Sequence, residues 1–223
     1  MVLIVIGILA GCEIVPIGSS DPKALTQTGS RIYRGDMFGH QGLVFFAAHT
    51  SALTAVYDTA RCGLYLAWKG PVLGSERDSK GRYVPQGPLY LLRDDPSLWT
   101  VLIGGDTVPS TIRMISFDQD STAYLAFHYS LNITGGRSLR IDEGVMHDNH
   151  YGDNALIRTF KCEGLDSTTT VRVKLGGQRG RWTELWSLGA SGNLEGVPGE
   201  ETLVMTYDGT SLVKVTWTGS GDI

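Results

Sequence analysis

The 223-residue sequence has little charge, few cysteines and no basic excess. Charged residues make up only 19% of the chain, the net charge is −4, and there are three cysteines. A nucleic-acid-binding protein normally shows a basic surface, so this balance argues against one. Hydrophobic residues reach 42%, which is too many for a chain that is disordered throughout. The chain is long enough and apolar enough to bury a sizeable core.

Polar side chains are missing from the first eleven residues, MVLIVIGILAG. This run is too short to cross a bilayer as a helix, which takes about 20 residues, but it matches the end of a secretory signal peptide. The sequence Leu9-Ala10-Gly11-Cys12 resembles a bacterial lipobox, which implies cleavage before Cys12 and a lipid on it, although no Lys or Arg precedes it. We therefore expect an extracytoplasmic lipoprotein, anchored to the outer membrane or cell surface through lipid. A β-strand at residues 2–6 is the alternative.

The chain divides into three predicted segments. Residues 1–12 form the signal peptide and lipobox, residues 13–41 a flexible tether, and residues 42–223 one domain. Residues 13–30 are rich in Ser, Thr, Gly and Pro and have no apolar periodicity, as is typical of a tether.

From Gly42 onward, alternating apolar and polar residues indicate β-strands. For example, Leu125, Phe127 and Tyr129 fall on one face of a predicted strand, and His128 falls on the other. Turn residues such as Gly104-Gly105 separate the strands at short intervals. We predict an all-β fold, an antiparallel β-sandwich of roughly a dozen short strands. The strands are expected at residues 43–49, 53–58, 63–69, 99–103, 111–118, 122–131, 138–143, 155–162, 168–175, 181–188, 203–207 and 211–217. Asp208-Gly209 further predicts a hairpin between the last two.

Three blocks of sequence, at residues 53–70, 99–118 and 155–160, carry a family resemblance. The first and most specific contains Tyr57-Asp58, Cys62 and Trp68-Lys69-Gly70. Over about residues 42–177 the chain resembles the β-rich accessory domain of large secreted bacterial proteins that also carry cytochrome c domains. The resemblance implies no catalytic residue. A His of that family is absent here, where Tyr83-Val84-Pro85-Gln86 stands, and without a Cys-x-x-Cys-His motif no covalent haem is expected.

Two cysteines, Cys62 and Cys162, lie in the predicted domain. In an exported protein they would be able to form a disulfide, which would close a loop of about 100 residues and add several kcal/mol of stability. The alternative is two separate buried thiols. The sequence leaves both possibilities open.

His147 and His150, three residues apart, are flanked by Asp148 and Asp153. These side chains are candidate ligands for Ca²⁺ or another metal. The alternative, which the abundance of Asp, Asn and Gly favours, is a solvated loop between strands. Apart from such a metal, no cofactor is expected.

Trp182 and Trp186 lie four residues apart on one predicted strand, so they are expected to share a face, about 13 Å apart. Flat aromatic side chains on a sheet face are suited to stacking against sugar rings, and Tyr151 and Trp68 are further candidates. The alternative is that the tryptophans fill the core.

These patterns leave three functions. The first is a non-enzymatic module that binds a glycan or another envelope protein. The second is a subunit of a surface fibre, a homopolymer in which the apolar N-terminal segment completes the sheet of a neighbouring copy. The third is a carbohydrate-active enzyme, for which Glu143, Asp148 and Glu184 are candidate carboxylates.

Overall fold

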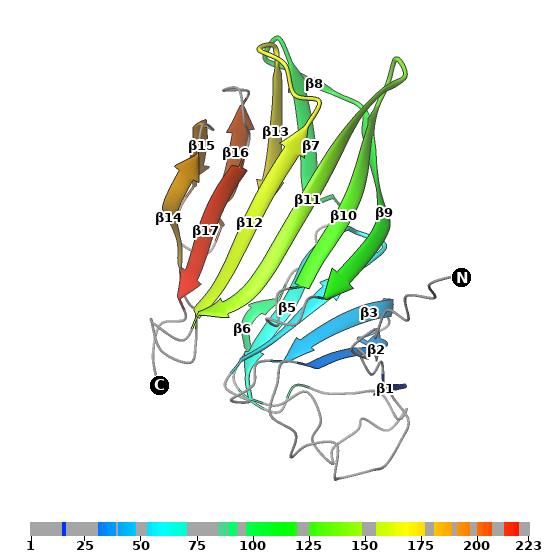
Figure 1. The fold of residues 1–223 in the computed structure, drawn as a ribbon, viewed down its shortest axis with the longest axis vertical. Helices are drawn as coiled ribbons and strands as arrows, with labels where there is room; N and C mark the ends of the chain where they lie inside the picture. The colour runs from blue at the N-terminus through cyan, green and yellow to red at the C-terminus, as the bar shows by residue number, and fades with distance from the viewer. Residues whose placement is uncertain are drawn as a thin grey trace, which may run out of the picture.

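The computed structural model describes residues 15–16, 31–38, 40–47, 53–70, 85, 87, 89–92, 97–119, 125–148, 155–176, 181–188, 191–196, 200–206 and 212–218. Every regular element in these ranges is a β-strand, and the strands form three sheets (Figure 1). The predicted all-β, sandwich-like fold is therefore confirmed. Within the same ranges, no helix is long and apolar enough to cross a membrane.

The first sheet is built from the N-terminal part of the chain. Its strands run in chain order: β1 (Val15–Pro16), β2 (Arg31–Met37), β3 (His40–Ala47), β4 (Leu53–Asp58), β5 (Gly63–Lys69) and β6 (Leu89–Leu92). β1 is parallel to β2, and the other neighbours are antiparallel. The boundary of the tether at residue 41 was therefore wrong, because β2 already pairs with β3 from Arg31↔Ala47 to Met37↔His40. Backbone pairing forms this strand although its sequence lacks an apolar period.

The second and third sheets make up the rest of the molecule, and Figure 1 shows the second in front of the third with the first below them. The second has the order β14 (Arg181–Leu188), β17 (Leu212–Thr218), β12 (Ala155–Glu163), β11 (Arg137–Asp148), β10 (Leu125–Ile133), β9 (Ser110–Gln119). The third has the order β15 (Ser191–Glu195), β16 (Thr202–Thr206), β13 (Thr169–Lys174), β7 (Trp99–Ile103), β8 (Asp106–Val108).

The predicted hairpin across Asp208-Gly209 is wrong. β16 pairs with β13 and β15 in the third sheet, whereas β17 pairs with β12 and β14 in the second. Both edges of each strand are thus occupied by other strands. The strands before and after Asp208-Gly209 therefore belong to different sheets.

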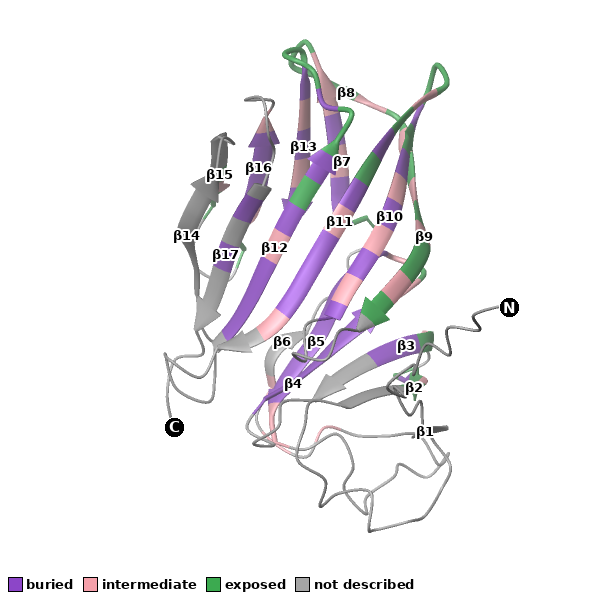
Figure 2. Cartoon of the chain, in the orientation of Figure 1, coloured by how far each residue is buried: buried purple, intermediate pink, exposed green. Residues whose placement is uncertain are grey.

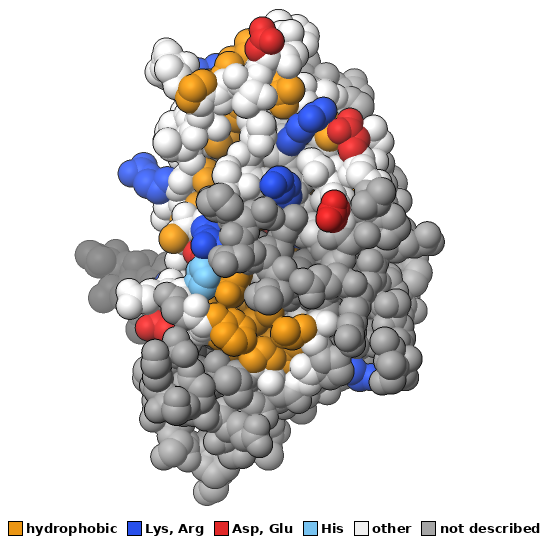
Figure 3. Space-filling view, turned by 180° about the vertical axis from the view of Figure 1, so that it is seen from behind, with side chains coloured by type: hydrophobic (Ala, Val, Ile, Leu, Met, Phe, Trp, Pro, Cys, Tyr) orange, Lys and Arg blue, Asp and Glu red, His pale blue; other side chains and the backbone are white. Residues whose placement is uncertain are grey.

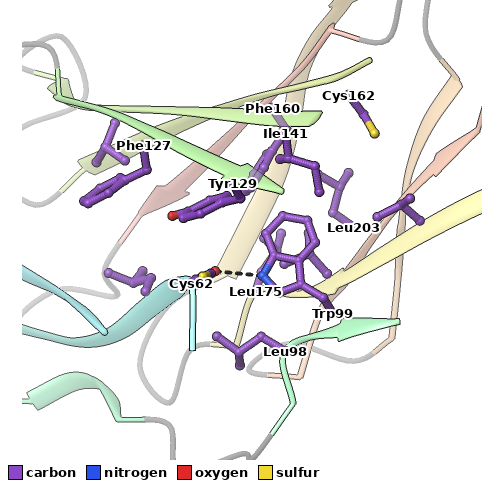
Figure 4. Packing of buried hydrophobic residues seen from close by; sticks show 14 of the residues in the cluster. Cys62, Leu98, Trp99, Phe127, Tyr129, Ile141, Phe160, Cys162, Leu175 and Leu203 are labelled. Carbon is purple, nitrogen blue, oxygen red and sulfur yellow. Dashed lines mark hydrogen bonds between the residues drawn. The ribbon is translucent and has the colours of Figure 1, made fainter. Parts of the chain in front are cut away.

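One hydrophobic cluster connects all three sheets. Along β10, buried residues alternate with partly buried or exposed ones, as Figure 2 shows, so one face of the strand points into the core. Tyr57 of the first sheet stacks on Phe127 of the second at 4.4 Å between ring centroids. Trp99 of the third sheet makes edge contacts with Tyr129 and Phe160 (Figure 4). Contacts between aromatic side chains thus hold the three sheets against one another.

A second, smaller hydrophobic cluster belongs to the first sheet alone. It contains Met37, Leu43, Val56, Tyr65, Leu66 and Trp68. Figure 3, the view from behind, shows hydrophobic side chains gathered in the lower half of the molecule. The first sheet therefore carries apolar side chains on both of its faces, because Tyr57 and Ala55 belong to the main cluster.

Candidate functional site

The outer face of β9, β10 and β11 carries a connected set of polar side chains centred on His128. The Nδ1 atom of His128 lies 2.6 Å from Oδ1 of Asp142 on β11, and its Nε2 atom lies 3.0 Å from Oδ2 of Asp118 on β9. Strand register explains the arrangement, because His128 is directly opposite Asp142. A carboxylate only accepts hydrogen bonds, so His128 donates to both aspartates when both of its ring nitrogens carry a proton.

Asp142 is held ionised by its neighbours. Partial burial would raise its pKa, but hydrogen bonds from His128 and Arg140 outweigh burial and lower the pKa below its ordinary value. The Nε atom of Arg140 donates to Oδ1 of Asp142 at 3.1 Å. Hydrogen-bond donors and acceptors thus alternate across this face and hold one another in place.

Neutral polar side chains continue this row toward the loop between β10 and β11. The hydroxyl of Ser130 lies 3.0 Å from that of Ser138 and donates to Asn132 at 3.1 Å. We call this set the polar face, and it comprises Asp118, His128, Ser130, Asn132, Ser138, Arg140 and Asp142. It presents both donors and acceptors to solvent on rigid strands, which suits a ligand rich in hydroxyl groups.

A buried ion pair occupies the inner side of the same sheet. Arg158 of β12 donates from Nε to Oε1 of Glu143 at 2.7 Å, and the two side chains are 1% and 0% exposed. The hydroxyl of Tyr129 donates to Oε2 of Glu143 at 3.1 Å. The guanidinium of Arg158 lies over the ring of Phe160, 4.7 Å from its centroid. Glu143, one of the carboxylates considered for a carbohydrate-active enzyme, is therefore buried in the core, where Arg158 and Tyr129 hold it.

The charges of this pair affect the groups around them. Burial alone would lower the pKa of Arg158, but Glu143 and the neighbouring tyrosines raise it above its ordinary value. Burial first, and the charge of Glu143 second, raise the pKa values of Tyr57 and Tyr129. The arginine therefore stays charged and the tyrosines stay neutral.

The most specific block of the sequence resemblance, residues 53–70, covers β4, β5 and a structured turn between them. Oδ1 of the buried Asp58 accepts hydrogen bonds from the backbone nitrogens of Ala60 and Arg61 at 2.9 and 3.1 Å. Its Oδ2 atom lies 3.2 Å from Nδ1 of His40. Cys62 ends the turn with a φ of +53°, a conformation that is uncommon outside glycine. Asp58 and Cys62 therefore have a structural role, because they fix the shape of this turn.

The structure contains Cys62 and Cys162 as free, buried thiols. Of the two possibilities that the sequence leaves open, the structure has the two separate thiols. Figure 4 places the two cysteines in different parts of the core. Burial raises the pKa of each to about 12, so both are protonated and poor nucleophiles. The carbonyl oxygen of Cys62 accepts a hydrogen bond from Nε1 of Trp99 at 2.7 Å, drawn as a dashed line in Figure 4.

The predicted aromatic site is not assembled as expected. Trp68 is completely buried in the second cluster, so it has no open ring face for a sugar. The backbone register pairs Trp182 with Trp217 and Trp186 with Lys214, and it shifts between Glu184 and Trp186. The shared face of Trp182 and Trp186 stays a prediction.

Several predicted site residues lie outside the described residues. These are Cys12, His150, Tyr151 and Asp153. Of His147, Asp148, Trp182, Glu184 and Trp186, the structure describes the backbone alone, and it places the first two at the end of β11, opposite Leu156 and Ala155. Across the described part of the chain, no group of three or more His, Cys, Asp or Glu side chains is arranged to hold a metal ion.

Sequence reasoning placed His128 on the face of its strand opposite Phe127 and Tyr129 but missed its partners. The alternation of β9, β10 and β11 puts Asp118, His128 and Asp142 on one face. The signal that would have joined them is the strand register, which alternation alone does not determine.

Comparison with known proteins gives no further assignment. No family model matches the chain, and no match is found among curated proteins. The resemblance to the accessory domain therefore remains a prediction that rests on the three sequence blocks.

Proposed function

We propose that this protein is a non-enzymatic, extracytoplasmic lipoprotein module that binds a glycan on the polar face. The observation that supports this proposal is the position of His128, held between two carboxylates on an open sheet face. Arg140 and the hydroxyl and amide groups of Ser130 and Asn132 extend the same surface.

The chemistry of sugars fits such a surface. Each sugar hydroxyl is both a donor and an acceptor, and the polar face offers carboxylate acceptors beside imidazole and guanidinium donors. Because hydrogen bonds within the face already hold these side chains, a ligand would lose little affinity to ordering them. The proposal therefore moves the glycan site from the predicted tryptophans to polar side chains.

Both described thiols and the carboxylate of Glu143 have structural roles in the core. Burial keeps both thiols protonated, and Glu143 is ion-paired with Arg158. These observations favour the binding module over the carbohydrate-active enzyme.

A glycan array followed by titration calorimetry with the best glycan tests the proposal. We expect Arg140→Ala and Ser130→Ala each to weaken binding about tenfold, which corresponds to about 1.4 kcal/mol. Arg172→Ala is the matched control, because it removes an exposed ion pair, to Glu195, from the third sheet. Binding that is lost equally in the control, or absent in the wild type, would contradict a glycan site on the polar face. Capture of an envelope protein instead would identify the other partner class.

The anchor is tested separately by the mass of the mature N-terminus in the native host. A diacylated Cys12 supports the lipoprotein proposal, whereas an intact Met1 contradicts it. The fibre alternative depends on the N-terminal segment, which lies outside the described residues, and negative-stain images of the purified protein test it.

A further inference from the structure

We propose that two copies of this chain pair through the free edges of their β9 strands and form a closed, two-fold symmetric dimer. The second sheet would then continue from one copy into the other. This inference goes beyond glycan binding and does not depend on it.

β9 is a long edge strand that is open to solvent. All of its ten residues except Ile115 pair with β10, and within the described residues no strand pairs with its other edge. Figure 2 shows β9 as exposed or partly buried over most of its length. Ile115, in its middle, is 57% exposed and is one of two large hydrophobic residues exposed in the described part of the chain. An open edge of this length is a template for another strand.

An irregularity at Ile115 places two opposite charges on the same face of β9. Met114 pairs with Tyr129 and Ser116 pairs with His128, so Ile115 is an extra residue with no partner on β10. Arg113 and Asp118 are five positions apart and would lie on opposite faces of a regular strand. Because of the extra residue, they pair with Ser130 and Ala126, which are four positions apart, and therefore lie on the same, outer face.

With this arrangement, β9 is complementary to the β9 strand of a second copy that runs antiparallel to it. In an antiparallel pair of β9 strands centred between Ile115 and Ser116, Arg113 of each copy lies opposite Asp118 of the other. The same register sets Met114 opposite Phe117, and both of these residues are on the inner face. Residues that are opposite in an antiparallel pair share a face, so both of these pairings are consistent. The two Ile115 residues lie on either side of the symmetry axis, each opposite Ser116 of the other copy.

The charge pattern selects a second copy of the chain over an unrelated strand. In the register described above, Arg113 of each copy pairs with Asp118 of the other. The two ion pairs are therefore equivalent, as an isologous interface requires. Both charges are exposed, and the side chain of Asp118 is 73% exposed although it contacts His128. The interface closes on itself and does not extend into a fibre.

Charge reversal tests this interface by sedimentation of the full chain over a range of concentrations. Wild type is expected to dimerise. Arg113→Asp and Asp118→Arg should each be monomeric, because each would place like charges opposite each other. An equimolar mixture of the two variants should dimerise again, because both heterologous pairs are then attractive. Recovery in the mixture also proves that both variants are folded.

Cross-linking tests the register. The double variant Arg113→Cys/Asp118→Cys should form a covalent dimer on mild oxidation. Within one copy the two positions are about 15 Å apart, which is too far for a disulfide. Thr111→Cys/Asp118→Cys is the control, because it would cross-link a different register. For the exposed hydrophobic residue on β9, Ile115→Ser is compared with Phe38→Ser, which changes the other exposed hydrophobic residue.

A monomeric wild type at all accessible concentrations would overturn the proposal. Dimers that survive both charge reversals, or open-ended assemblies, would also overturn it. Loss of glycan binding without loss of the dimer would contradict only the proposed function.

Discussion

Arg158 and Glu143 face each other inside the core, where Nε of the arginine donates to the glutamate at 2.7 Å and neither side chain is more than 1% exposed. A buried ion pair adds little stability compared with a hydrophobic pair of similar size. Removing one partner is costly, because it leaves an uncompensated charge in the core.

Glu143→Gln is therefore expected to lower the free energy of unfolding by about 3–5 kcal/mol, as measured by urea denaturation. The double variant Glu143→Leu/Arg158→Met removes both charges and should recover most of this loss. If Glu143→Gln is as stable as wild type, the buried charge of Arg158 does not need the Glu143 carboxylate to compensate it.

The two thiols predict a loss of stability at alkaline pH. Their pKa is about 12 in the folded chain, compared with 9.0 ordinarily. Between these values the unfolded chain releases the thiol protons while the folded chain keeps them. The unfolded state then binds fewer protons, so stability falls as pH rises from 9.0 to about 12, by at most about 1.4 kcal/mol per pH unit for each thiol. Urea denaturation at about pH 8 and about pH 10.5 measures the effect, and Cys62→Ala/Cys162→Ala should reduce it.

Burial also predicts that both thiols resist alkylation in the native state. Iodoacetamide should label Cys62 and Cys162 only after denaturation, and the intact mass should show no loss of the two hydrogens that a disulfide removes. A mass lower by these two hydrogens would reinstate the disulfide.

Asp166 predicts a loss of stability at low pH in the turn between β12 and β13. Hydrogen bonds from Thr169 and Thr168 lower its pKa to about 2, and its Oδ2 atom lies 2.8 Å from Nη1 of Arg137. A lowered pKa stabilises the fold above the ordinary pKa of 3.8, and this contribution disappears as pH falls toward 2. Asp166→Asn should therefore melt below wild type at neutral pH, with the difference in Tm narrowing below about pH 4. A difference that is constant with pH would exclude the carboxylate charge as its source.

Substitution of Trp68 distinguishes a role in packing from a role in ligand binding. Because the ring is completely buried, Trp68→Ala is expected to cost about 3–5 kcal/mol in stability and to leave the glycan affinity of the folded protein unchanged. Thermal unfolding and calorimetry measure the two effects. A stable variant with weakened binding would return Trp68 to the site.

Local sequence patterns predicted the strands well. β4, β5, β7 and β14 have the predicted bounds, and the other eight predicted strands are present with shifted ends. Alternation is a local property, and one buried face produces it directly, as in β10. The strands that were missed are β1, β2, β6, β8 and β15. They are short or lack alternation, and pairing with neighbours forms them.

Features that depend on strand pairing were not predictable in the same way. The hairpin at Asp208-Gly209 failed because two distant strands, β12 and β13, pair with its two arms. The register shift between Glu184 and Trp186 was not predictable either, because it depends on how β14 pairs with β17. The polar face was missed for a related reason, since Asp118 and His128 meet only once the register of β9 on β10 is known.

The main cluster has a consequence for how the chain is made. It joins Val44 near one end of the sequence to Val215 near the other. Contacts between such distant residues make folding slow, in the range of milliseconds to seconds that is typical of all-β proteins. Tyr57 meets its stacking partner Phe127 only after β10 has been synthesised, and the cluster also needs Val213 and Val215 of β17. The main cluster is therefore complete only once β17 has been synthesised, so we expect its last contacts to form after translation has ended.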